Sequence, residues 1–203
     1  MSIFRSLLNQ GSVQEYTFLE YIQGQGQQYI NLDYYPTTKT GIEFELLSDG
    51  RQNMWDFGSN RGWQLDAYGV FSFYYDGPHW YMTNDYSFNV VNDLRDNRKY
   101  NIKFDKSGYY VDGSYLTPKE AFTPTVEFKT PYPMYLFVQN VGTKPTECST
   151  IRVYFFKIFE NGVLMKHLLP AKRNSDNAIG MVDILTNTFY ENKGSGEFLY
   201  GTL

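Results

Sequence analysis

Two glutamates in one short segment have the spacing that comes closest to a catalytic pair. Glu43 and Glu45 stand in segment 41–46, where apolar and polar residues alternate, so both carboxylates would lie on one face of a strand. Paired carboxylates hydrolyse glycosidic bonds, one acting as the nucleophile and the other as the acid. A solvated strand face without a catalytic role explains the same pattern, and it is the interpretation that we favour.

A nucleophile assisted by histidine is the second chemistry that the residue types allow. The chain holds one cysteine, Cys148, and two histidines, His79 and His167, in three separate segments. A nucleophilic site needs such groups brought together and oriented by a third group. No Gly-x-Ser-x-Gly elbow accompanies them. We therefore predict ordinary histidines and a buried or idle thiol.

Metal binding has little support. Calcium takes several oxygen ligands, and Asp105, Asp176 and Asp183 offer scattered carboxylates without an Asp-x-Asp-x-Asp-Gly loop. The sequence therefore predicts no cofactor, and a single calcium ion stays open as the alternative.

The residues best suited to a ligand or a partner lie between Arg51 and Tyr86, which include all three tryptophans. An indole matches the apolar C–H face of a sugar, and neighbouring Asn, Asp and Arg groups match its hydroxyls. The same rings fit a core between sheets or a protein interface, where Trp, Tyr and Arg are enriched. The candidate glycan or partner surface consists of Trp55, Arg61, Trp63, Asp66, Trp80, Asn84 and Tyr86.

Composition excludes other classes of function. The net charge of −4 offers no basic field for a nucleic-acid backbone. No run of about 18 apolar residues exists to span a membrane, and the start does not read as a Sec signal peptide. We expect a protein made in the cytoplasm that leaves the cell only within a larger assembly.

Alternating apolar and polar residues predict the strands that would position these groups. Segment 98–105 alternates like segment 41–46 and forms a hairpin with 109–113. Asn161-Gly162 predicts a tight hairpin between strands at 150–159 and 163–169, the second closed by Pro170.

Runs that are apolar on both faces predict two packed layers. Segments 134–140 and 150–159 have this character, as central strands between layers do. The glutamines and glycines of 23–28 connect strands at 16–22 and 29–32 and form the first corner of the fold. Their side chains can satisfy loop backbone groups or meet a partner. We predict an all-β, antiparallel two-sheet β-sandwich over residues 14–203.

The first 13 residues form a separate N-terminal arm. Ile3, Phe4, Leu7 and Leu8 fall on one face of a short helix that also carries Arg5. Such a helix is too short to persist alone in water. It docks either on its own domain or on a partner.

Five stretches resemble, in order, the LamG-like, concanavalin A-like jelly-roll domains common in phages and gut bacteria. They span about residues 16–198: TFLEYIQGQGQQYINL, IKFDKSGYYVDG, TPYPMYLFVQNVG, IRVYFFKIFENGVLMKHLLPAKR and IGMVDILTNTFYENKGSGEF. The resemblance implies a jelly roll of two antiparallel sheets. Because such domains often occur in phage tails, baseplates and head decorations, it also implies a virion location, other virion proteins as partners, and loosely a contact with host glycans.

The laminarinase-like members of this group carry a Glu-x-Asp-x-x-Glu strand, which this chain lacks. The sequence therefore favours a non-enzymatic virion structural protein. A carbohydrate-binding module of an adhesion protein is the alternative, and a glycoside hydrolase using Glu43 or Glu45 is the third reading.

Overall fold

The computed structural model describes residues 15–47, 55–59, 69–74, 77–82, 97–105, 107–116, 130–142 and 148–203, with the backbone alone for 55–59, 69–74 and 77–82. These residues form strands, turns and loops and contain no helix. The prediction of an all-β fold is confirmed for this part of the chain. Within the same ranges, no helix exists that could cross a membrane.

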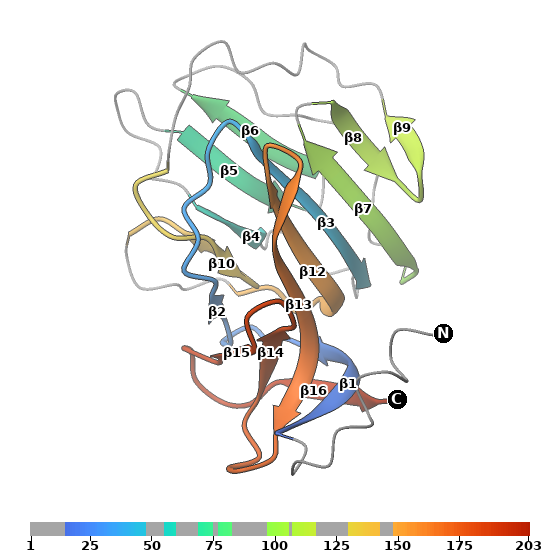
Figure 1. Ribbon diagram of the computed structural model, residues 1–203, viewed down its shortest axis with the longest axis vertical. Coiled ribbons are helices and arrows are strands. Elements are labelled where there is room, and N and C mark those ends of the chain that lie inside the picture. The colour runs from blue at the N-terminus through green and yellow to red at the C-terminus, as the bar shows by residue number, and fades with distance from the viewer. Residues whose placement is uncertain are drawn as a thin grey trace.

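A large sheet of ten strands dominates the molecule (Figure 1). Its strands follow the order β15-β14-β13-β1-β12-β3-β7-β8-β9, and β16 pairs with β1 beside this path. Every pairing in it is antiparallel. The bounds are β1 Tyr16–Gln23, β3 Thr40–Leu47, β7 Lys99–Asp105, β8 Gly108–Val111, β9 Ser114–Leu116, β12 Arg152–Glu160, β13 Val163–Arg173, β14 Ile179–Asp183, β15 Thr188–Glu191 and β16 Leu199–Thr202.

A second sheet of six strands follows the order β2-β10-β4-β5-β6, and β11 pairs with β4 beside this path. Its pairings are antiparallel except for that of β4 with β11. The bounds are β2 Ile30–Asn31, β4 Trp55–Ser59, β5 Gly69–Tyr74, β6 Gly77–Met82, β10 Tyr135–Leu136 and β11 Gln139–Asn140.

The predicted alternation in the middle of the large sheet is confirmed. Ile42, Phe44 and Leu46 of β3 are buried, and they lie opposite Phe104, Ile102 and Tyr100 of β7, which are buried as well. Because successive side chains of a strand point to opposite faces, the residues between them form the outer face of this sheet.

One core cluster joins the two sheets. It contains Ile30 and Leu136 of the small sheet together with Ile22, Phe44 and Phe156 of the large sheet. The rings of Phe44 and Phe156 lie 5.6 Å apart on paired strands. Since both sheets contribute to one core, the architecture is sandwich-like.

The glutamine-rich segment after β1 is a corner at which the chain passes from the large sheet to the small one. Gly26 has a φ of +90°, and a Cβ on Gly24 would lie 2.2 Å from the carbonyl oxygen of Ser149. Gln28 is buried, accepts a hydrogen bond from Gln25 N (2.7 Å) and donates one to Ser195 O (2.8 Å). The expectation that these glutamines satisfy loop backbone groups is confirmed.

A single carboxylate fixes the return from the small sheet to the large sheet. Glu160, at the end of β12, accepts hydrogen bonds from the hydroxyls of Tyr34 (2.6 Å), Thr37 (2.7 Å) and Thr40 (3.1 Å). These three residues belong to the connection between β2 and β3 and to the first position of β3. Burial, and next the bond to Glu160, raise the pKa of Tyr34.

The hairpin between β12 and β13 forms as predicted, but β13 does not end at Pro170. Asn161 and Gly162 have φ values of +50° and +81°, as a two-residue hairpin turn with the right-handed twist of the strands requires. β13 continues to Arg173, so the expected stop at Pro170 is wrong.

The register explains why proline is tolerated there. His167 accepts a backbone bond from Ile184 N, and Arg173 donates one to Ala178 O, both on the β14 side. Alternation therefore points the nitrogen of Pro170 to the opposite side. On that side β13 pairs with β12 up to Leu168 and with β1 from Ala171, so Pro170 stands where no ladder bond is needed.

The single central strand predicted at 134–140 is also wrong. The segment is buried, but it forms the two short strands β10 and β11. They run in opposite directions relative to β4, so a turn must separate them. Phe137 makes this turn with a φ of +73°, and its ring packs 4.9 Å from that of Phe198.

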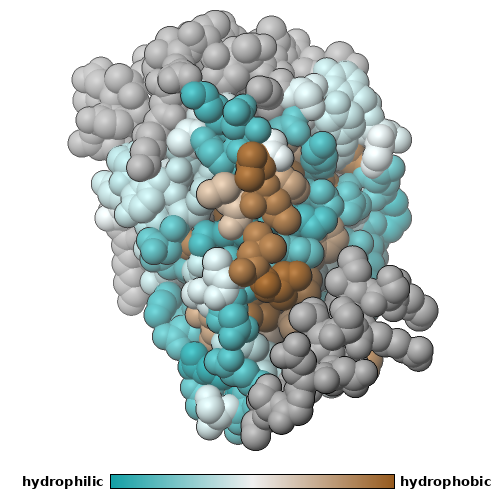
Figure 2. Space-filling model, viewed as in Figure 1, coloured by the Kyte–Doolittle hydropathy of each residue, from teal (hydrophilic) through white to brown (hydrophobic). Residues whose placement is uncertain are grey.

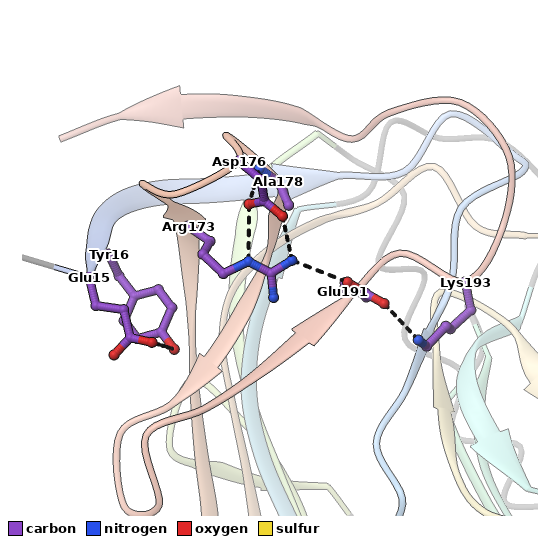
Figure 3. A network of polar contacts seen from close by, with 7 residues as sticks. All are labelled: Glu15, Tyr16, Arg173, Asp176, Ala178, Glu191 and Lys193. Atoms are coloured by element: carbon purple, nitrogen blue, oxygen red, sulfur yellow. Dashed lines mark hydrogen bonds and ion pairs between the residues drawn. The ribbon is translucent and has the colours of Figure 1, made fainter.

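An ionic network secures the end of the large sheet near β15 (Figure 3). Arg173 holds Asp176 through two hydrogen bonds of 3.0 and 2.7 Å and reaches Glu191 at 3.3 Å, while Lys193 pairs with Glu191 at 2.9 Å. The hydrogen bonds from Arg173 are the main reason why the pKa of Asp176 is lowered to about 2.

Candidate functional site

The tryptophan-containing surface predicted from the sequence lies almost entirely outside the described residues. The backbone places Trp55 in β4 opposite Tyr74, and Trp80 in β6 opposite Phe71, so both belong to the small sheet. Their side chains, like all of Arg61, Trp63, Asp66, Asn84 and Tyr86, fall outside the description, as do the arm residues Ile3, Phe4, Arg5, Leu7 and Leu8. These assignments stay predictions.

The two glutamates lie together on the outer face of β3, as their spacing requires, but both contact lysines. Lys157 Nζ lies 2.7 Å from Glu43 Oε1, and Lys99 Nζ lies 3.7 Å from Glu45 Oε1 and 3.4 Å from Glu20. A glycosidase needs two carboxyl groups that are free to act on a substrate. Here each glutamate forms an ion pair with a lysine of a neighbouring strand, so this arrangement is suited to cross-strand pairing.

Aromatic rings and cations alternate on the same outer face. Lys99 Nζ lies 3.7 Å above the ring of Tyr154, and the guanidinium of Arg152 lies 4.7 Å from the ring of Tyr21. The two tyrosine rings are themselves 5.6 Å apart. Such contacts between a ring and a cation stabilise a surface by about 0.5–1 kcal/mol each, so this face has an ordered set of side chains.

A pair of tyrosines stands out at the β9 end of that face. Tyr109 is buried, and its neighbour Tyr110 points outward, as expected for adjacent residues of a strand. Tyr110 packs edge-on against Tyr115 at 5.4 Å, and Lys103 Nζ lies 5.8 Å from its centroid. Tyr115 is 51% exposed, so its ring can receive the apolar face of a ligand.

The surroundings of Cys148 and His167 fit a structural role. Cys148 is buried, and burial raises the pKa of its thiol to about 11, so the thiolate is not available at neutral pH. The prediction of a buried thiol is confirmed. His167 is half-buried in β13, where burial, and next the charge of Lys157, lower its pKa. The side chain of His79 in β6 lies outside the description.

The three aspartates considered for calcium are engaged separately. Asp183 is buried and accepts bonds from the backbone of His167 and Leu185 and from the hydroxyl of Thr186. Asp176 belongs to the Arg173 network, and Asp105 accepts a bond from the backbone of Ser107. In the part of the chain with described side chains, no three ligating side chains gather as a metal would require.

Among the side chains that the structure describes, three consecutive exposed apolar ones lie at the tip of the β12–β13 hairpin. Val163, Leu164 and Met165 follow each other in the strand and are 62%, 36% and 47% exposed. Leu185, also exposed, follows β14 where that strand runs beside β13. We call these four residues the hairpin patch. Figure 2 shows hydrophobic residues in a column down the middle of one face, over the hairpin seen in Figure 1.

Sequence reasoning missed both the hairpin patch and Tyr115. Apolar residues at three consecutive positions directly after a tight turn are a usable signal. Because adjacent side chains of a strand point to opposite faces, exposure at all three positions means that both faces of the strand are open there. The sequence around Tyr115 carries no such signal. Only the strand register shows that its ring packs against that of Tyr110.

No protein-family model matches the chain, and no curated protein matches it either. The resemblance carried by the five sequence stretches is therefore the basis for any assignment to a family.

Proposed function

We propose that the chain is a non-enzymatic structural protein of a bacteriophage virion, either a head decoration or a tail or baseplate component. Residues 14–203 form a jelly-roll β-sandwich of the LamG-like kind, and residues 1–13 form an arm that docks on a neighbouring virion protein. The proposal joins the all-β architecture and the shared core of two sheets to the resemblance that spans nearly the whole chain.

The observation that carries the proposal is the hairpin patch. Neighbouring apolar side chains that stay exposed at a hairpin tip are typical of protein–protein contacts rather than of a free surface. Burying a fully exposed side chain of this kind stabilises a complex by about 1.5–3 kcal/mol, and these partly exposed side chains contribute correspondingly less. The four side chains of the hairpin patch fit a protein that attaches to an assembly, in which each copy contacts several neighbouring proteins.

Incorporation into particles tests this proposal. The double variant Val163→Ser with Met165→Ser should fold normally, because both side chains are exposed, and should be depleted from purified particles. Deleting residues 2–12 should also abolish incorporation while the domain stays folded. Tyr115→Ser is the matched control, since it removes an equally exposed side chain elsewhere. Unchanged incorporation of both altered chains would sink the proposal.

Carbohydrate binding is the second candidate, and the exposed Tyr110–Tyr115 pair favours it. An exposed ring beside the charged groups of Lys103 and Asp105 offers both stacking and hydrogen bonds. A glycan-array signal that Tyr115→Ala abolishes would support this site. A signal lost instead on Trp63→Ala or Trp80→Ala would assign binding to the surface predicted from the sequence.

A glycoside hydrolase remains the alternative function among enzymes. Hydrolysis of a β-glucan that is lost on Glu45→Gln would contradict the non-enzymatic assignment. The ion pairs of Glu43 and Glu45 with lysines are the reason why we expect no turnover.

A further inference from the structure

Met165 differs from the other methionines whose side chains the structure describes. It is 47% exposed, whereas Met134 and Met181 are 0% exposed and belong to the core that joins the two sheets. A soluble oxidant can convert a thioether to a sulfoxide only where it reaches the sulfur atom. In the described part of the chain, Met165 is therefore the methionine that such an oxidant meets first.

The strand pairing explains why Met165 is open to water. On the β12 side, Lys166 lies opposite Ile158. The next pair in the register joins Leu164 to Phe159, so Met165 is the extra residue of a β-bulge and has no partner on β12. On the other side of β13, the register with β14 begins only further along the strand. Met165 therefore stands outside both ladders, at a position where a bulge redirects the side chain.

We propose that Met165 is a modification site, at which oxidation by a peroxide changes the polarity of the hairpin patch. Hydrogen peroxide transfers one oxygen atom to Sδ, the thioether loses two electrons, and the peroxide leaves as water. The product is a polar sulfoxide beside the apolar side chains of Val163 and Leu164. Burying it against an apolar partner without a hydrogen bond costs free energy, so oxidation weakens docking through the patch. This last step rests on the proposed function, whereas the oxidation itself does not.

Limited oxidation of the full folded chain with dilute hydrogen peroxide tests the chemistry. Peptide mapping by mass spectrometry should find Met165 oxidised at least about tenfold faster than Met134 and Met181. In concentrated urea, which unfolds the core, the three should react at similar rates. The melting temperature should stay unchanged once Met165 is oxidised, because its side chain is exposed. Equal rates in the folded chain would overturn the proposal.

Hydrophobic-interaction chromatography then measures the patch itself. Peroxide should shorten the retention of the natural chain on the column. Met165→Leu is the matched control, because leucine keeps the patch apolar and cannot be oxidised, and its retention should change less. Met1, Met54 and Met82 are present in both chains, so the difference between the two reports on Met165 alone. Equal shortening in both chains would show that the patch does not change polarity and would refute the proposal.

Binding to particles assembled without the chain tests the consequence for docking. The oxidised natural chain should bind about fivefold more weakly than the untreated chain, while peroxide-treated Met165→Leu should bind as before. If the oxidised chain binds as tightly as the untreated one, oxidation does not control docking and the inference is wrong. If neither binds, the proposed function is contradicted instead, and the first two measurements still decide whether Met165 is the modification site.

Discussion

The carboxylate of Glu160 should be one of the most stabilising polar groups in the described part of the protein. It accepts three hydroxyl hydrogen bonds, of 2.6, 2.7 and 3.1 Å, from residues of the connection between the sheets. A hydrogen bond to a charged group contributes about 1.5 kcal/mol or more. Three such bonds would therefore contribute about 4.5 kcal/mol if they were independent.

The actual loss in Glu160→Ala should be smaller, because one donor has a second acceptor. Tyr34 Oη lies 3.1 Å from Thr40 Oγ1 and can turn its proton there, whereas the hydroxyls of Thr37 and Thr40 lose their acceptor. We therefore expect Glu160→Ala to lower the free energy of unfolding by about 3 kcal/mol. Glu160→Gln, which keeps one acceptor oxygen, should cost about 1 kcal/mol.

Urea unfolding of the natural chain and of the variants measures these free energies. Glu197→Ala is the matched control, because Glu197 is exposed, and it should change stability by less than about 0.5 kcal/mol. If Glu160→Ala cost no more than this control, the carboxylate would not hold the connection and the reasoning would be refuted.

The hydrogen bonds around Glu160 also predict how the stability of the protein changes at alkaline pH. The pKa of Tyr34 is raised above its ordinary value of 10.0 in the folded protein. Its contribution to stability is therefore complete below that pH and declines as the pH rises above it. Tyr34→Phe should flatten this alkaline decline, and an unchanged slope would contradict the assignment.

Four further predictions concern single residues. Gly24→Ala should lower stability by about 2–3 kcal/mol, because its Cβ would meet a backbone oxygen at 2.2 Å. Gly162→Ala should lower stability by only about 1 kcal/mol, because its Cβ would meet open space although the φ is +81°. Urea unfolding can compare these two glycine variants. The pKa of His167 is lowered below 6.5 by burial, so its contribution to stability is lost as the pH falls below that value, and His167→Gln should flatten the acidic decline in melting temperature. Arg173→Ala should return the pKa of Asp176 from about 2 towards its ordinary value, as an NMR titration would show.

Much of the large sheet was predictable because its signals are local. The alternation of Ile42, Phe44 and Leu46 identifies a half-buried strand without reference to any neighbour. Asn161-Gly162 identifies its hairpin because both residues adopt the positive φ that the turn needs. Local sequence and tertiary structure agree at these positions.

Errors arose where distant strands decide the outcome. Pro170 is tolerated in β13 only because the strand changes partner from β12 to β1 at that point. Phe137 adopts its positive φ at a turn where its ring packs against Phe198, a residue distant in the sequence. Neither fact can be read from a window of neighbouring residues.

The candidate site was predictable only in part. The spacing of Glu43 and Glu45 indicates a shared face, but the lysines that contact them come from β7 and β12, so the register was needed to find the ion pairs. The surface around Trp63 and Trp80 stays a prediction, since its side chains lie outside the described residues.

Quantitative mass spectrometry of purified phage particles tests the central claim most directly. We predict that the intact chain is present in a fixed ratio to the capsid or tail proteins and stays bound after washing that removes soluble proteins. A chain that is absent from the particles, or that is lost on washing, would contradict the assignment as a virion structural protein.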